Sequence, residues 1–245
     1  MSSSNDHHPI TSKYMWLAGL LKQQIEAEIW RPREAIPSER QLEVKYKVSR
    51  PTIRQAIDYL ERSGLVYREH GRGTFVSPQK LQKGMQELTS FSEDLIRRGI
   101  KPGQIIRSIS RVVPTENILR RLEMEPGTTV LQIERIRLGD NTPIGLQTSF
   151  VVLEEGQEIT KEDLEKSGSL YAILQEKFNI IPTEADETLE VTLATPEEAI
   201  LLHVKTDAPL LLNERLTYNQ NRKPVEFVKI LYRGDRYRYI TRLSR

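Results

Sequence analysis

Two arginines four residues apart, Arg50 and Arg54, stand in the stretch VSRPTIRQAI of residues 48–57. On a helix, residues at this spacing lie on neighbouring turns of one face. A guanidinium group can donate two parallel hydrogen bonds to O6 and N7 of guanine in the major groove of DNA. A single exposed arginine is more often solvated than bound. The interpretation as a DNA-reading helix therefore depends on the elements around it.

Other residues near this pair carry groups suited to DNA. Ser49, Thr52 and Gln55 offer hydroxyl or amide groups for phosphates or base edges, and Arg40 lies where it can brace a phosphate. In REHGRG, residues 68–73, glycines without Cβ atoms allow backbone N–H groups to approach a phosphate or the minor groove. The candidate DNA contacts are Arg40, Ser49, Arg50, Thr52, Arg54, Arg68, His70, Gly71, Arg72 and Gly73.

Three predicted helices position these residues. Apolar residues recur at three- and four-residue spacing between residues 11 and 30, which predicts an amphipathic helix. Ser38 and Gln41 form a capping-box pattern at the start of a second, short helix. Ser49 is suited to cap a third helix, and Pro51 falls in its first turn, where the missing N–H has no intrahelical partner.

The third helix leads into a predicted hairpin. Its apolar face has helical spacing and consists of Ile53, Ala56, Ile57 and Leu60. Gly64 suits the left-handed position after the helix. Two short strands, residues 65–68 and 74–77, then flank a glycine-containing turn. Three helices and a hairpin predict a winged helix-turn-helix domain over residues 1–77.

Composition restricts the class of protein. Residues 1–80 carry 13 Lys and Arg against 9 Asp and Glu, whereas the remainder carries 23 against 25, so the basic excess favours a polyanion on the first domain. The absence of cysteine excludes disulfides and thiolate chemistry. The first residues lack the apolar core of a signal peptide, and no apolar run approaches the roughly 18 residues of a membrane span. We expect a soluble, cytoplasmic protein.

A second domain follows a polar stretch at residues 78–88, which we interpret as a linker. From residue 89 to 245, strands alternate with short helices, and short turns imply antiparallel neighbours. The fold class is predicted as α+β, with an antiparallel sheet and helices on one face. The predicted strands are residues 105–113, 129–138, 144–152, 187–194, 210–218, 225–232 and 236–243, and the predicted helices 116–122, 161–165, 170–177 and 196–204.

Polar residues in this second domain could bind a small anion. Arg135 and Arg137 are two apart in a predicted strand, so both guanidiniums can converge on one anion. Serines at 90 and 92, and Ser169 before Tyr171, precede predicted helix N-termini, whose free N–H groups favour anions. Glu226 and Tyr232 share a strand face and suit sugar hydroxyls. Each feature also has a purely structural interpretation: ion pairs with Glu190 or Glu214, simple caps, or packing.

The segment IPSERQLEVKYKVSRPTIRQAIDYLERSGLVYREHGRGTFV, residues 36–76, resembles the GntR superfamily of bacterial winged-helix repressors across nearly its whole signature. This resemblance places Arg40, Arg50, Arg54 and Gly71 at family DNA-contact positions. It implies that Ser49 and Thr52 contact the DNA backbone.

The remainder resembles the UTRA effector-binding domain of the HutC-like subfamily, whose fold is similar to that of chorismate lyase. The resemblance is carried by residues 88–103, 134–138, 168–174 and 224–239. In relatives that sense amino-sugar phosphates, the matching positions around the phosphate are Ser90, Phe91, Ser92, Arg135, Arg137, Ser169 and Tyr171. Those facing the sugar are Gln147, Glu226 and Tyr232. Such sensors often carry glutamate where this chain has Gln147, and an amide lacks the charge that favours an ammonium group.

These observations predict a homodimeric, ligand-responsive repressor that leaves double-stranded operator DNA when a small anionic effector, such as an amino-sugar phosphate, binds residues 89–245. The alternatives are a sensor of a non-phosphorylated aromatic or fatty acid, and an enzyme built on the lyase-like domain. Against an enzyme, His7 and His8 lie in the tail, His70 lies in the wing, and His203 is expected in the core. We expect no cofactor, no metal site and no membrane partner.

Overall fold

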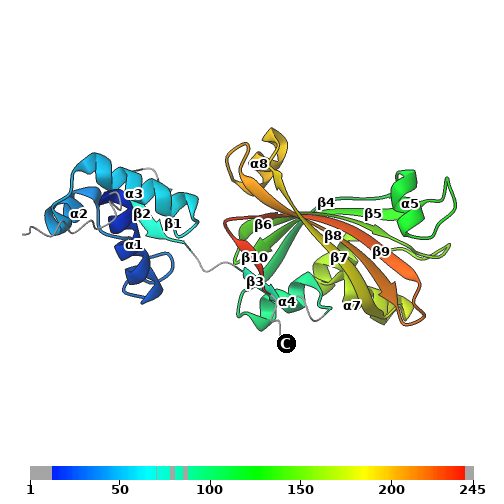
Figure 1. Ribbon diagram of the computed structural model, residues 1–245. Helices are drawn as coiled ribbons and strands as arrows, with labels where there is room; N and C mark the ends of the chain where they lie inside the picture. The colour runs from blue at the N-terminus through cyan, green and yellow to red at the C-terminus, as the bar shows by residue number, and fades with distance from the viewer. Residues whose placement is uncertain (1–12, 70, 78–80, 85–87, 241–245) are drawn as a thin grey trace, which may run out of the picture. The chain divides into compact units, whose positions relative to one another are not determined.

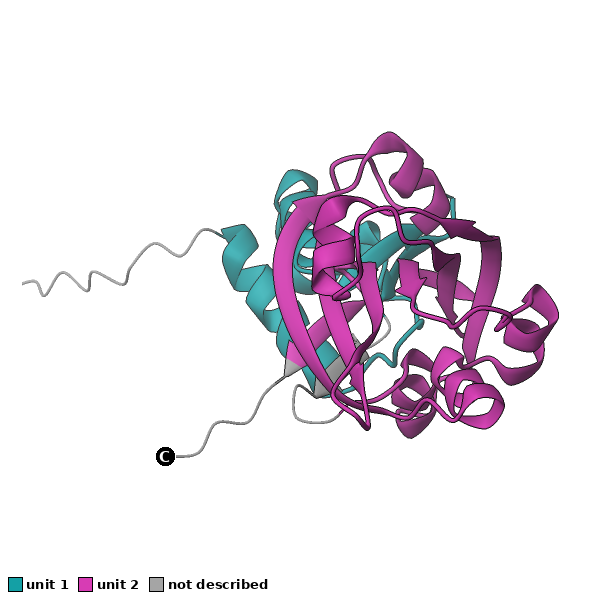
Figure 2. Ribbon diagram, turned by 90° about the vertical axis from the view of Figure 1, so that its right-hand side faces the viewer, with its two compact units in different colours: residues 1–79 teal, residues 80–245 magenta. Residues whose placement is uncertain are grey.

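The computed structural model describes residues 13–69, 71–77, 81–84 and 88–240. The chain divides into two compact units, Met1–Gln79 and Lys80–Arg245, which are coloured separately in Figure 2. Among the described residues, no helix is long and apolar enough to cross a membrane.

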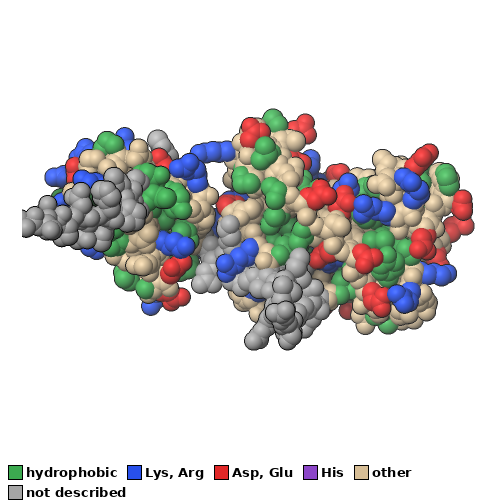
Figure 3. Space-filling view, viewed as in Figure 1, with side chains coloured by type: hydrophobic (Ala, Val, Ile, Leu, Met, Phe, Trp, Pro, Cys, Tyr) green, Lys and Arg blue, Asp and Glu red, His purple; other side chains and the backbone are tan. Residues whose placement is uncertain are grey.

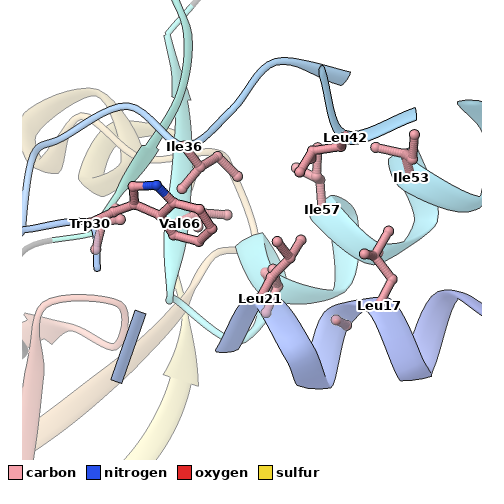
Figure 4. Close-up of a cluster of buried hydrophobic side chains, with 12 residues drawn as sticks. Leu17, Leu21, Trp30, Ile36, Leu42, Ile53, Ile57 and Val66 are labelled. Atoms are coloured by element: carbon pink, nitrogen blue, oxygen red, sulfur yellow. The ribbon is translucent and has the colours of Figure 1, made fainter. Parts of the chain in front are cut away.

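The first unit contains three helices and a hairpin (Figure 1). Their bounds are α1 (Lys13–Glu26), α2 (Glu39–Tyr46), α3 (Arg50–Arg62), β1 (Val66–Glu69) and β2 (Gly73–Val76). The two strands pair antiparallel, with Val66 opposite Val76. Apolar side chains from all three helices and the hairpin form one core, in which Leu17, Leu21, Leu42, Ile53, Ile57 and Val66 surround a common centre (Figure 4).

Local capping chemistry determines where these helices start, although not always as the sequence predicts. At α2 the capping box is confirmed, because Ser38 and Gln41 bond each other's backbone N–H groups. At α3, Ser49 occupies the N-cap position without a side-chain bond to the backbone. Its hydroxyl lies 2.9 Å from that of Thr52 instead. Gly64 follows α3 at φ 70°, as its missing Cβ allows.

The first helix is shorter than predicted. It ends at Glu26, and Glu28 has φ 54°, a left-handed conformation that interrupts the helical hydrogen-bond series. Ile29, an apolar residue within the predicted helix, is 60% exposed, whereas Trp30 is buried against the first unit's core. Periodicity alone does not detect a left-handed residue at a non-glycine position.

The second unit is built on a six-stranded sheet, ordered β4-β5-β6-β9-β8-β7, in which every neighbouring pair is antiparallel. The strands are β4 (Pro102–Val112), β5 (Val130–Gly139), β6 (Thr142–Val151), β7 (Pro182–Leu193), β8 (Pro209–Asn219) and β9 (Pro224–Arg233). The predicted antiparallel α+β class is confirmed. Five short helices accompany it: α4 (Phe91–Arg97), α5 (Glu116–Arg121), α6 (Lys161–Ser167), α7 (Leu170–Phe178) and α8 (Pro196–Leu202).

These helices cover both faces of the sheet, whereas the sequence predicts helices on one face. Leucines of α4, α6 and α7 pack with Ile133, Val228 and Ile230 on one face. Helix α5 packs with Phe227 on the other face. Helix α8 packs with Leu231, also on that face. His203 is exposed at the C-terminal cap of α8, with φ 54°, and the core position predicted for it is wrong.

The predicted linker contains a strand. Within residues 78–88, β3 (Leu81–Gly84) pairs in parallel with β10 (Tyr237–Ile240), near the end of the chain. A strand this short is stabilised by its distant partner, which no local pattern reveals. Of the strand predicted at 236–243, residues 241–243 lie outside the described residues.

The packing of α2 into the core of the first unit can be tested directly. Leu42→Ala removes a side chain with no exposed surface and is expected to lower the free energy of unfolding of this unit by about 2–5 kcal/mol. Val44→Ala, on the same helix but 74% exposed, is the matched control and should change it little. Both tryptophans of the chain, Trp16 and Trp30, lie in this unit, so denaturation followed by tryptophan fluorescence reports on it alone. Equal effects of the two variants would contradict the packing described.

Candidate functional site

The first unit presents the N-terminal half of α3 to solvent. The side chains of Arg50 and Arg54 are 63% and 67% exposed. Each guanidinium donates from Nε to a carboxylate of α2, Arg50 to Glu43 at 3.0 Å and Arg54 to Glu39 at 3.1 Å. The arginines singled out in the sequence therefore lie on an exposed face and are oriented by a neighbouring helix.

The hairpin residues are placed in two ways. Arg68 bonds Asp58 at 2.6 Å and Glu61 at 2.7 Å, so its guanidinium ties β1 to α3. Arg72 pairs with Glu69 and lies over the ring of Phe75 at the tip. Gly71 and Gly73 have φ of 73° and 130°, which glycine adopts without strain. Arg40 and Gln55 are exposed, and His70 lies outside the described residues.

The second unit encloses a cavity between the sheet and the starts of two helices. Eight of the ten predicted effector contacts line it: Ser90, Phe91, Arg135, Arg137, Gln147, Ser169, Tyr171 and Glu226. Leu170, Arg215 and Val228 complete the lining. The sequence therefore locates most of this pocket from residues far apart in the chain.

Strand register explains the convergence. Opposed residues of antiparallel strands share a face, and Arg135 lies opposite Gln147, while Val228 lies opposite both Ser149 and Arg215. The polar side chains of β5, β6, β8 and β9 consequently line one face. The first turns of α4 and α7 lie over it, where Ser90 accepts from the Glu93 N–H and Ser169 from the Ala172 N–H.

Arg135 and Arg137 are two buried cations of the cavity lining. They are 2% and 3% exposed, and both donate from Nη1 to Oε1 of Gln104, at 3.3 and 3.0 Å. Burial lowers the pKa of Arg135 to about 10, against the opposing effect of the Glu226 carboxylate. Burial, and then the neighbouring Arg135, lower the pKa of Arg137.

The same two arginines retain bonding capacity. Their Nε–H groups have no hydrogen-bond partner among the described residues. The alternative pairing with Glu214 does not occur, because Glu214 bonds Arg121 and Lys229. Two adjacent buried cations held by a neutral amide leave positive charge that an anion would compensate.

Beside these arginines the cavity also presents acceptors, since Gln147 is the cross-strand partner of Arg135. Gln147 donates its amide to the Ser149 hydroxyl at 2.9 Å, and its Oε1 has no partner among the described residues. Glu226 is 2% exposed, and its Oε1 is likewise unpartnered there. A carboxylate and a carbonyl oxygen suit a ligand that also offers hydroxyl or ammonium donors.

Two predicted contacts, Ser92 and Tyr232, do not line the cavity. The Ser92 hydroxyl donates to the carbonyl oxygen of Gly168 at 2.7 Å and so ties α4 to the residue before Ser169. The Tyr232 ring stacks on that of Tyr237 at 3.9 Å between centroids. Both support the pocket wall in this structure, because tertiary partners already occupy their polar or aromatic surfaces.

Arg215 is the charged residue of the cavity lining that the sequence did not suggest. It donates to Glu187 on β7, and its Nη1 reaches the Thr89 carbonyl at 3.3 Å and the Tyr171 hydroxyl at 3.5 Å. One guanidinium thus joins the starts of α4 and α7. Although burial by itself lowers it, Tyr171 and Glu187 hold the pKa of Arg215 above its ordinary value. Its alternation with Asn213 and Thr217 was visible, but resembles a solvated strand face.

Comparison with known proteins agrees with this arrangement. Residues 13–76 match the family model "Bacterial regulatory proteins, gntR family", and residues 97–238 match the UTRA domain. The UTRA match alone spans more than half of the chain. The chain belongs to the GntR family of bacterial transcriptional repressors and carries a UTRA domain.

This GntR-family repressor has similar relatives over nearly its whole length. It is 36% identical to the HTH-type transcriptional repressor NagR of Bacillus subtilis (strain 168), over 98% of each chain. It is 28% identical to the histidine utilization repressor of Pseudomonas aeruginosa, over 99% of each. The crystal structure of PhnF from Mycobacterium smegmatis matches with a TM-score of 0.62 at 27% identity, covering 93% of this chain and 98% of that one.

The role of Arg215 in this repressor can be tested by its effect on stability. Arg215→Met removes the buried guanidinium that pairs with the half-buried Glu187 carboxylate and is expected to lower the free energy of unfolding of the second unit by about 3–5 kcal/mol. Arg222→Met breaks an exposed pair with Glu184 at 3.6 Å and should change it by less than about 1 kcal/mol. Denaturation followed by far-ultraviolet circular dichroism measures both. Equal, small effects would show that Arg215 does not hold the pocket.

Proposed function

We propose that this repressor binds operator DNA as a homodimer through the N-terminal half of α3, and that a small phosphorylated sugar or a similar anion releases it by binding the UTRA cavity. The observation that carries the proposal is that two buried cations, Arg135 and Arg137, and two acceptors, Gln147 and Glu226, line one cavity. Such a cavity suits a ligand with an anionic group and several hydrogen-bond donors.

The DNA part rests on exposure and spacing. Arg50 and Arg54 project from neighbouring turns of α3, while Arg72, Gly71 and Gly73 form the tip of the wing. In helix-turn-helix proteins the start of the second helix meets the base edges, and a dimer reads half-sites about one helical turn, roughly 34 Å, apart. Arg40, Ser49 and Thr52 would then contact the sugar–phosphate backbone.

The effector part rests on charge compensation. The helix starts at Ser90 and Ser169 add N–H dipoles to the two guanidiniums, and both features favour an anion. On the surface shown in Figure 3, basic and acidic side chains of the second unit are interspersed. Arg135 and Arg137 are buried, and the low dielectric of the interior strengthens their attraction for an anion.

The switch requires a difference in affinity. An effector that bound both dimer arrangements equally would shift nothing, however tightly it bound. We expect the effector to stabilise an arrangement in which the two α3 helices no longer match the half-site spacing. The ligand thus acts on the population of DNA-competent dimers.

Replacing Arg50 and Arg54 together by alanine is expected to weaken binding to DNA from upstream of the protein's own operon by at least about tenfold, because each arginine loses a two-bond contact with guanine. Arg62→Ala, in the last turn of α3, is the control and keeps the affinity near that of the wild type. Mobility shifts at one fixed salt concentration measure the change. Unchanged binding by the double variant would show that α3 is not the recognition helix.

A thermal-shift panel tests the effector. Glucose 6-phosphate, glucosamine 6-phosphate and inorganic phosphate are compared with benzoate and octanoate. At least one phosphorylated sugar should raise Tm, and Arg137→Gln should weaken that binding by about tenfold or more, since a buried charged hydrogen bond is lost. Arg222→Ala, outside the cavity, is the control. A shift with benzoate or octanoate alone would reject the phosphate site.

A further inference from the structure

Two carboxylates of α2 are matched to the two exposed arginines of α3. Glu39 and Glu43 are four residues apart on α2, as Arg50 and Arg54 are on α3. Two ion pairs connect the helices: Glu43 pairs with Arg50, and Glu39 pairs with Arg54. Because the spacing is equal on both helices, the two ion pairs lie side by side between α2 and α3.

In both ion pairs the guanidinium donates from the same atom, Nε. Each carboxylate accepts from Nε, at 3.0 and 3.1 Å, and no other hydrogen bond of these two guanidiniums occurs among the described residues. A guanidinium group is planar and has its N–H donors in a fixed fork. A bond at Nε therefore fixes the plane and leaves the outer edge, with Nη1 and Nη2, available for two parallel bonds.

The local structure of α2 holds the acids in place. The capping box of Ser38 and Gln41 fixes the start of the helix, directly before Glu39. Leu42, with no exposed surface, anchors the helix between the two acids. The side chains of Glu39 and Glu43 are 34% and 39% exposed, so the pairs lie at the surface. Surface ion pairs add little to folding stability, so stability does not account for these two ion pairs.

The acids also change how the arginines meet DNA. A carboxylate beside each guanidinium repels phosphate and reduces the charge available for sequence-independent binding. Contacts to O6 and N7 of guanine depend on the direction of the fork, whereas attraction to phosphate depends mainly on charge. The carboxylates thus weaken the sequence-independent attraction to phosphates. They favour directional hydrogen bonds to a base edge with the matching acceptor pattern.

We propose that Glu39 and Glu43 are specificity-determining residues of this repressor. They position the forks of Arg54 and Arg50 for two-bond contacts with guanine and lower affinity for DNA of other sequence. This inference rests on the proposed contacts of Arg50 and Arg54 with DNA and adds the residues that make those contacts selective.

The test compares two DNA probes. One is a duplex enriched by the wild-type full-length chain from a randomised library, and the other is the unselected library. Glu39→Gln combined with Glu43→Gln should reduce the preference for the enriched duplex by at least about fivefold, the equivalent of weakening one good two-bond contact. Affinity for the unselected library should stay equal or increase, because two negative charges are removed. Glu26→Gln, which removes an acid of the exposed α1 pair with Lys22, should leave the preference unchanged.

A double-mutant cycle shows whether the acids act through the arginines. In an Arg50→Ala background, Glu43→Gln should have no further effect on the preference. A loss of affinity for both probes together with a lower Tm would overturn the proposal, since it would mark a structural role. An equal gain for both probes, with the preference kept, would also overturn it. If Arg50→Ala with Arg54→Ala itself keeps the preference, the proposed DNA contacts fail, which is a separate result.

Discussion

The burial of three guanidinium groups on one face of the six-stranded sheet is the constraint that organises the second unit. Arg135, Arg137 and Arg215 are each at most 7% exposed. A buried charge is tolerated only when it is paired or hydrogen-bonded. Arg215 meets this requirement with Glu187, and in doing so holds the starts of α4 and α7. The other two are held by a neutral amide, and their Nε–H groups have no partner among the described residues.

The first unit uses the same residue type under the opposite condition. Arg50 and Arg54 are exposed, so no desolvation penalty forces them to be paired. Their partners Glu39 and Glu43 therefore affect direction and charge more than stability. The proposed function uses both conditions: buried arginines that bind a small anion, and exposed arginines that discriminate between DNA sequences.

Much of the architecture was accessible from local patterns. The four-residue spacing of α3, the capping box of α2 and the alternation in β5 each arise from interactions within a few residues, and each is present in the structure. Predictions failed where distant partners decide. Helices α5 and α8 pack on the second face of the sheet, and β3 forms because β10 is beside it. Arg215 was missed because an alternating polar strand resembles a solvated one until α4 and α7 cover it.

The sequence by itself determined most of the elements, the family and most residues of both candidate sites, because periodicity, capping and turn chemistry are short-range. Only the tertiary structure decided which polar groups lose their water. Strand register placed Arg135 opposite Gln147, and packing withdrew Ser92 and Tyr232 into the wall. Register and packing set burial, and burial decides whether a charge needs a protein partner or remains available to a ligand.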